Sequence, residues 1–116
     1  GRTLYVTNEL ALTLAAFRWD ADAGTLALIA TLPLVDRRPA GEATAAHVEV
    51  APSGRFAYAT VRGPDELVVM ALDPATGAPS PVQRVATGGR WPRHFALDPT
   101  GRLLLVANQR SGTVVA

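Results

Sequence analysis

Short stretches in which apolar and polar residues alternate follow one another along the chain, and turn residues separate them. Residues 47–52 (HVEVAP) alternate at period two, and residues 54–61 (GRFAYATV) follow a Pro-Ser-Gly turn. Residues 66–73 (ELVVMALD) are rich in strand-forming side chains and run into a second turn, DPATG. Apolar alternation bounded by Gly and Pro predicts short antiparallel strands.

Two further segments complete this pattern. Residues 80–87 (SPVQRVAT) read as a fourth, weaker strand, and the proline near its start fits the edge of a sheet. Residues 9–17 (ELALTLAAF) carry apolar side chains at helical spacing, but they align with GPDELVVM at residues 63–70, a loop that leads into a strand. We therefore expect a loop followed by a strand there too, and we predict an all-β chain.

The strand pattern repeats along the chain. An offset of 47 residues pairs His47 with His94, Pro52 with Pro99, Gly54 with Gly101, and Arg55 with Arg102. An offset of 53 residues pairs Gly1 with Gly54, Tyr5 with Tyr58, Thr7 with Thr60, Asp20 with Asp73, and Gly24 with Gly77. The difference between the offsets predicts an insertion between Ile29 and His47, where two prolines, a glycine and an Asp-Arg-Arg run are typical of a surface loop.

Four short antiparallel strands in a unit of about 40–50 residues are typical of one blade of a β-propeller. We therefore predict one domain over residues 1–116, a partial β-propeller with units 1–46, 47–93 and 94–116. Propellers have about four to eight blades, and these units amount to about two and a half. Missing propeller blades, or self-association, are expected to cover the blade edges. The alternative is a small β-sandwich in which the repeat arises by chance.

Composition narrows the range of functions. The 11 basic residues nearly balance the 10 acidic ones, and the arginines are scattered, so we expect no nucleic-acid partner. The absence of cysteine excludes disulfides and thiolate metal sites. The apolar runs are too short to cross a membrane, and no signal peptide is visible at the start, so we expect a cytoplasmic protein.

Polar residues gather where the strands of a blade meet at one rim. The first strand runs away from that rim and the second returns to it, so the start of one lies beside the end of the other. His47 and His94 open two such first strands, and Arg62 and the pair Asn108-Gln109 end the strands that follow. The 53-residue offset places Asn8-Glu9 in the equivalent position of the first unit.

Glu9, Arg62 and Gln109 thus occupy one position in three successive units. Each alone has an ordinary explanation, since strand-end amides often bond the backbone and single charged side chains usually lie in solvent. A purely structural position would repeat one residue type, so three different functional groups favour a polar site, with Arg93, His94 and His47 near it. We expect Trp91 at this rim or in the wall of a pocket, and Trp19 in the core between two units.

Four segments resemble the lactonase family of seven-bladed propellers, the 6-phosphogluconolactonase type. They are LYVTNEL (4–10), APSGRFAYATVRG (51–63), ALDPATG (71–77) and GGRWPRHFALDPTGRLLLVANQ (88–109), and their order suits the C-terminal third of that family. The resemblance implies hydrolysis of a small-molecule sugar lactone, such as 6-phosphogluconolactone of the pentose phosphate pathway, with no metal and no cofactor. Two positions depart from the family pattern, Val61 in place of an asparagine and Glu49 in place of a histidine.

The resemblance also implies roles for single residues. Glu9 matches the acid of the family's Asn-Glu-Leu element, Arg62 its Arg-Gly element, Arg93 its Pro-Arg-His element and Gln109 its Asn-Gln element. We expect water to attack the lactone carbonyl, with Glu9, or a histidine beside it, as general base. The catalytic candidates are Glu9, Arg62, Arg93 and His94, and the substrate-binding candidates are Asn8, His47, Asn108 and Gln109.

Two other functions fit the same residues. A non-catalytic propeller would bind a partner through its rim or faces and would expose an aromatic patch at Trp91. A cycloisomerase-like enzyme would form a lactone on the same scaffold. Lactonase activity is not expected from residues 1–116 alone, because the absent blades of the family contribute site residues of their own.

Overall fold

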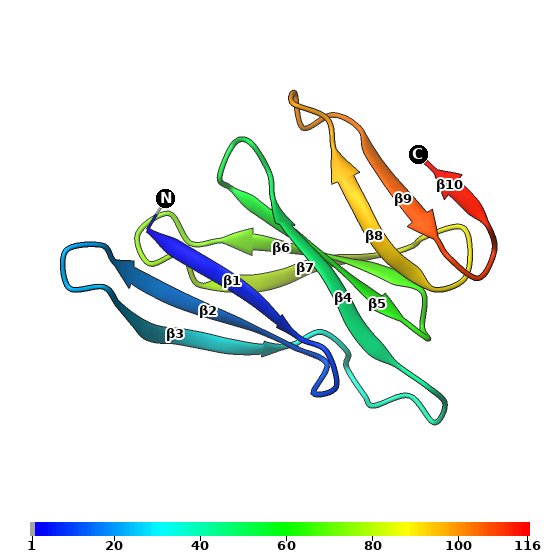
Figure 1. Ribbon diagram of the computed structural model, residues 1–116, viewed down its shortest axis with the longest axis horizontal. Coiled ribbons are helices and arrows are strands. Elements are labelled where there is room, and N and C mark those ends of the chain that lie inside the picture. Colours follow the sequence, from blue (N-terminus) through cyan, green and yellow to red (C-terminus); the bar gives the residue numbers. More distant parts are fainter. Residues whose placement is uncertain (1) are drawn as a thin grey trace.

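The computed structural model describes residues 2–116, and it confirms the all-β prediction (Figure 1). Within these residues the strands are β1 (Thr3–Asn8), β2 (Thr13–Asp20), β3 (Thr25–Pro33), β4 (Thr44–Val50), β5 (Phe56–Arg62), β6 (Glu66–Leu72), β7 (Pro79–Ala86), β8 (Pro92–Leu97), β9 (Leu104–Asn108) and β10 (Thr113–Val115). Gly1, which the repeat pairs with Gly54, lies outside the described residues. No helix within residues 2–116 is long and apolar enough to cross a membrane.

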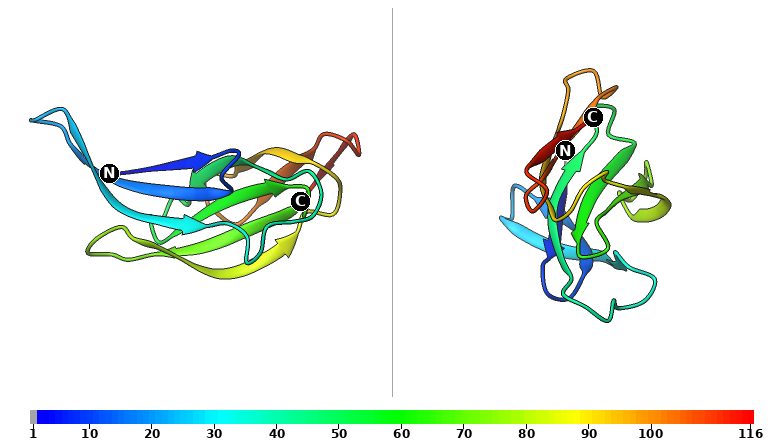
Figure 2. Two further views of the ribbon diagram at one scale, coloured as in Figure 1. Left: turned by 90° about the horizontal axis from the view of Figure 1, so that it is seen from below. Right: turned by 90° about the vertical axis from the view of Figure 1, so that its right-hand side faces the viewer.

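The strands form three antiparallel sheets, ordered β1-β2-β3, β4-β5-β6-β7 and β8-β9-β10. The sheets lie side by side, and β4 runs between β1 and β8 (Figures 1 and 2). Strand β4 is therefore the inner strand of a complete four-stranded blade, and β7, which begins at Pro79, is its outer edge. The first sheet has no described counterpart of β4, and the third has none of β7. This arrangement is a partial β-propeller, as predicted.

The predicted unit boundaries at His47 and His94 fall inside strands. Strand β4 begins at Thr44 and strand β8 at Pro92, so each inner strand starts two or three residues before its histidine. The predicted insertion lies where expected: the loop of residues 34–43 joins β3 to β4, whereas the equivalent connection from β7 to β8 covers only residues 87–91. A cut at the two histidines therefore divides β4 and β8.

The middle sheet buries both of its faces. One face packs on the first sheet through a cluster of Leu12, Leu14, Leu34, Ala45, Ala57, Ala59, Val61, Val68 and Met70. The other face packs on the third sheet through Leu67, Phe95 and Val106. Small side chains at alternate positions of β5 let the first two sheets approach closely, and burial of this apolar surface supplies most of the packing energy.

The two outer faces remain apolar and exposed within residues 2–116. Leu4 and Val6 alternate with the inward-facing Tyr5 on β1, and Leu103 and Leu105 lie on the outer face of the third sheet. Trp19, which we expect in the core between two units, is 41% exposed within residues 2–116. It aligns with Leu72, which packs against the first core cluster. The repeat therefore transfers an element's position more reliably than the burial of one side chain.

The loop of residues 34–43 makes hydrogen bonds and ion pairs with both neighbouring sheets and their turns. Arg84 on β7 donates to the carbonyl of Leu34 and lies 3.3 Å from Asp36. Arg38 donates to the carbonyl of Leu10 through two nitrogens, at 3.2 and 3.3 Å. Gly63, in the turn after β5, comes so close that a Cβ there would lie 2.2 Å from the carbonyl oxygen of Glu42. The insertion is thus a packed part of the rim.

Gly63→Ala should destabilise the protein more than Gly54→Ala. Both glycines have positive φ, 102° and 71°, so both substitutions pay the left-handed cost of about 1–2 kcal/mol. Only Gly63 faces the backbone of Glu42, since a Cβ at Gly54 meets no atom within 4 Å. We expect a further loss of ~1–3 kcal/mol for Gly63→Ala, measured by urea unfolding of both variants beside the parent chain. Equal losses of unfolding free energy in the two variants would show that the 34–43 loop shifts at no cost to make room for the Cβ.

Candidate active site

The strand ends that carry the candidate residues meet at one rim. The arrowheads of β1, β5 and β9 all point the same way, toward the lower right of Figure 1. Arg62, the last residue of β5, pairs with Thr44 at the start of β4, and Asn108 pairs with Pro92 at the start of β8. Antiparallel pairing therefore brings the beginning of each inner strand to the end of the next strand, as the sequence predicted.

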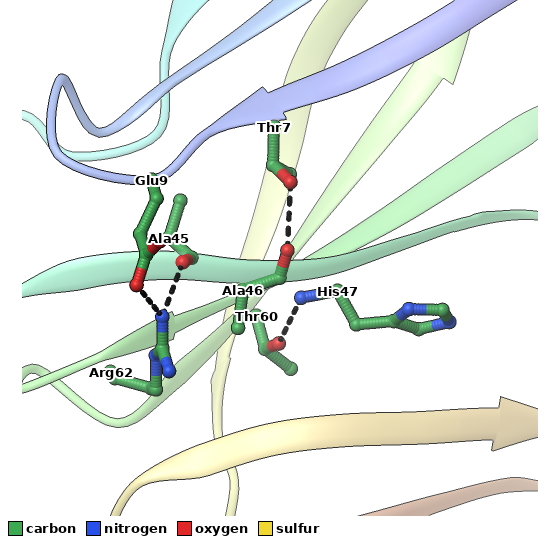
Figure 3. Close-up of polar contacts among 7 residues, drawn as sticks. All are labelled: Thr7, Glu9, Ala45, Ala46, His47, Thr60 and Arg62. Atoms are coloured by element: carbon green, nitrogen blue, oxygen red, sulfur yellow. Dashed lines mark hydrogen bonds and ion pairs between the residues drawn. The ribbon is translucent and has the colours of Figure 1, made fainter.

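Glu9 and Arg62 are in direct contact across the first two sheets. Arg62 Nη2 lies 2.8 Å from Glu9 Oε1, and the same nitrogen donates to the carbonyl of Ala45 at 2.9 Å (Figure 3). The Arg62 side chain is only 10% exposed, whereas that of Glu9 is 62% exposed. The structure thus fixes a buried guanidinium and points a solvent-accessible carboxylate at it.

Trp91 extends this contact toward the third sheet. The guanidinium carbon of Arg62 lies 5.5 Å from the centroid of the indole ring, and that of Arg110 lies 3.5 Å from it. Arg110 Nη2 is in turn 3.0 Å from Glu42 Oε2. A continuous series of charged and aromatic groups therefore crosses the rim from Glu9 to Glu42. The expected place of Trp91 at the rim agrees with this, while Arg110 and Glu42 were not singled out from the sequence.

His47 and His94 form a second cluster on the inner strands. Their ring centroids are 4.2 Å apart at 52°, and Phe95 packs edge-on against His47 at 4.7 Å. His47 Nε2 lies 3.5 Å from Glu49 Oε2. Burial lowers the pKa of His47 from 6.5, the charge of His94 lowers it further, and Glu49 opposes both effects. The neutral imidazole, which can accept a proton, is thereby favoured at His47.

Bulges place these histidines. The register of β4 with β5 shifts between Ala45 and Val48, and that of β8 with β9 shifts between Pro92 and His94. In β4 the bulge is held by Thr7 Oγ1, which donates to the carbonyl of Ala46, and by the Thr60 hydroxyl, which accepts from the His47 amide. Bulges commonly re-aim side chains near functional sites.

The two clusters face different ways along β4. Figure 3 shows the His47 ring pointing away from the Glu9–Arg62 pair, with the bulge bonds of Thr7 and Thr60 between them. Arg93 occupies the bulge of β8 and is exposed. The structure therefore brings Glu9 together with Arg62, and His47 together with His94, as two groups.

The side chains of Asn8, Asn108 and Gln109 differ in their contacts and exposure. Asn8 donates to the Thr13 hydroxyl at 2.9 Å and closes the turn after β1. Asn108 is 1% exposed, and its amide donates to the carbonyl of Thr87 at 2.9 Å. Gln109 is exposed and its backbone amide donates to the carbonyl of Trp91. Asn108 therefore has a structural contact and almost no surface for a ligand, whereas Gln109 keeps a free-standing side chain at the rim.

Acidic residues and histidines do not gather into a metal-binding group within the described residues 2–116. The chemistry available at the rim is that of carboxylates, guanidinium groups and imidazoles. A carboxylate beside a fixed guanidinium can exchange a proton with water while the cation stabilises negative charge on a neighbouring oxygen.

Comparison with known proteins gives consistent matches over nearly the whole chain. Residues 1–116 match the family model described as "Lactonase, 7-bladed beta-propeller". The 6-phosphogluconolactonase of Bacillus subtilis (strain 168) is 31% identical over 111 residues, which cover 96% of this chain and 32% of that protein. The 6-phosphogluconolactonase of Formosa agariphila is 42% identical over 72 residues, covering 60% of this chain and 20% of that protein.

Solved structures agree. The periplasmic gluconolactonase of Pseudomonas aeruginosa superimposes with a TM-score of 0.90 at 36% identity, over 98% of this chain and 31% of that chain. A protein from Lactobacillus plantarum superimposes with a TM-score of 0.88 at 25% identity, over 99% of this chain and 37% of that chain. This chain thus spans about a third of the length of the proteins it matches over nearly its whole length.

The lowered pKa of His47 gives stability a defined pH dependence. Because the folded chain holds this proton less tightly than the unfolded chain, stability should fall as pH drops through 6.5. NMR titration of the imidazole should give a pKa below 6.5, which His94→Gln raises and Glu49→Gln lowers further. His47→Gln should reduce the loss of stability between about pH 7.5 and about pH 5.5. A His47 pKa at or above 6.5 would contradict this account.

Proposed function

Because the chain belongs to the family of seven-bladed β-propeller lactonases, we propose that the protein hydrolyses a sugar lactone and that its substrate is 6-phosphogluconolactone. The relatives from Bacillus subtilis and Formosa agariphila, which carry the name 6-phosphogluconolactonase, support the substrate. The product would then be 6-phosphogluconate, an intermediate of the pentose phosphate pathway.

The contact between Glu9 and Arg62 carries this proposal. It joins a solvent-accessible carboxylate, in the turn after β1, to a buried guanidinium at the end of β5, 2.8 Å apart and at equivalent positions of the repeat. This asymmetry of exposure suits a hydrolase, in which the base reaches water while the cation stays fixed in a low-dielectric position.

The reaction we propose is attack of water on the lactone carbonyl carbon. Glu9 takes a proton from the attacking water, and the carbonyl oxygen becomes an oxyanion that Arg62 stabilises. The bond between the carbonyl carbon and the ring oxygen then breaks, and Glu9 returns the proton to that oxygen. Arg93 would assist Arg62 in charge stabilisation, since it is exposed on the bulge of β8.

The remaining candidates would hold the sugar. His94 and Gln109 are exposed and would donate to or accept from its hydroxyl groups. His47, whose neutral form is favoured, would position His94 through their ring contact. Asn8 would act through the turn that carries Glu9. For Asn108 we propose support of the rim through Thr87, in place of direct substrate contact.

We propose further that additional blades of the same propeller cover the two outer faces. Those faces expose Leu4, Val6, Leu103 and Leu105, and a blade needs a neighbour on each face. A cytoplasmic location follows from a phosphorylated substrate, because sugar phosphates are made with ATP inside the cell. The Pseudomonas aeruginosa gluconolactonase is named as periplasmic, so cell fractionation is the direct measurement.

Glu9→Gln should lower lactone turnover by at least ~10-fold with little change in KM, because a positioned general base contributes about 10²–10⁴-fold. The measurement is the rate of 6-phosphogluconolactone hydrolysis by the full-length protein. Glu66→Gln is the matched control, since it removes another carboxylate that lies beside an arginine, Arg84. Unchanged turnover in Glu9→Gln would show that another group acts as the general base.

A further inference from the structure

Arg110 is held at the rim by its backbone. Its amide donates to the carbonyl of Arg90, and the preceding amide of Gln109 donates to the carbonyl of Trp91. The guanidinium carbon then lies 3.5 Å from the centroid of the Trp91 ring. Stacking on an aromatic face leaves the edge of the guanidinium, with its donors, free to bind an anion.

The Trp91 platform is itself built under strain. Trp91 has φ of 66°, a conformation that bulky residues rarely adopt, whereas Asp65, with φ of 58°, is of a type that adopts it more readily. The Trp91 amide donates to Asp65 Oδ1 at 2.9 Å, and the Asp65 carbonyl accepts from the Thr87 amide and hydroxyl. Strain of this kind persists where surrounding contacts over-determine it, and it concentrates at ligand sites.

A small pocket opens beside this platform. It has a volume of about 210 Å³ and is lined by Glu42, Gly63, Asp65, Arg90, Trp91 and Arg110. Since one water occupies about 30 Å³, the pocket can hold a compact anionic group with some of its waters. It adjoins the proposed reaction site, because Arg62 approaches the same indole ring from 5.5 Å.

The two arginines on this ring differ in how replaceable their partners are. Arg62 is buried and donates to Glu9 and to a backbone carbonyl. Arg110 is 43% exposed and pairs with Glu42, which is 63% exposed on the 34–43 loop. An exposed pair of this kind contributes little, so a dianion that offers bidentate acceptors can displace Glu42.

We propose that Arg110 binds the phosphoryl group of the substrate and sets the preference for phosphorylated over unphosphorylated lactones. Glu42 is the counter-ion that occupies Arg110 in the absence of substrate, and Trp91 holds the guanidinium in place. This inference rests on the proposed lactonase function, and it assigns the discrimination between two lactone classes to one residue outside the acid–base pair.

The test compares kcat/KM for 6-phosphogluconolactone and for gluconolactone in the full-length protein. Arg110→Met should lower the value for the phosphorylated lactone by at least ~10-fold and leave that for gluconolactone within ~2-fold, because a charge-assisted bidentate contact is lost. Glu42→Gln should raise the value for the phosphorylated lactone, the opposite sign, because it frees Arg110. Arg102→Met, at an exposed turn, is the control and should change neither value.

An equal loss of kcat/KM for both lactones in Arg110→Met, or a loss of kcat/KM in Glu42→Gln, would overturn the proposal. Either result is what we expect if the Arg110–Glu42 pair only holds the 34–43 loop in place. Calorimetric binding of 6-phosphogluconate and gluconate separates this question from the reaction. If the protein hydrolyses no lactone, the proposed function is wrong. The binding of 6-phosphogluconate then still tests whether Arg110 forms a phosphoryl site. Binding of 6-phosphogluconate that Arg110→Met leaves unchanged overturns the site, whereas a selective loss supports it.

Discussion

The rim depends on one hydrogen-bonded cation, Arg62. Its Nη2 joins the carboxylate of Glu9, in the turn after β1, to the Ala45 carbonyl of β4, so this turn and strands β4 and β5 meet at one nitrogen. Burial makes this arrangement stiff, because an unpaired guanidinium in the interior would be costly. Since Arg62 ends β5 opposite Thr44, its place is set by the register of the β4–β5 ladder. The polar site is thus a consequence of strand pairing.

The contact between Glu9 and Arg62 could be predicted from the sequence, because equivalent positions of adjacent repeat units lie close together in space. Glu9 and Arg62 are equivalent residues of adjacent units, and the structure brings them together. Stacking of Arg110 on Trp91 was out of reach, because it depends on a left-handed backbone that no residue type at that position signals. The burial of Asn108 and the exposure of Trp19 within residues 2–116 could not be predicted for another reason: burial depends on which sheet covers a face, and alignment to another unit does not record that.

The inner-strand bulges explain why the histidines and the acid–cation pair form separate clusters. Each bulge adds one residue to the inner strand just after it leaves the rim, so the side chains beyond it are re-aimed. Ala45, before the bulge, offers its carbonyl to Arg62, while His47, within the bulge, meets His94 of the next inner strand. Both inner strands carry a bulge near this point, and His47 and His94 contact one another there, away from the Glu9–Arg62 pair.

Burial gives the two carboxylate–guanidinium pairs around Trp91 different uses. In the Glu9 pair the cation is covered and the anion is open, so the cation keeps its position and the anion can meet water. In the Glu42 pair both partners are substantially exposed, so solvent weakens the attraction and the partner is exchangeable. The same two functional groups therefore form a fixed pair on one side of the indole ring and an exchangeable pair on the other. The difference between them is the burial of the guanidinium.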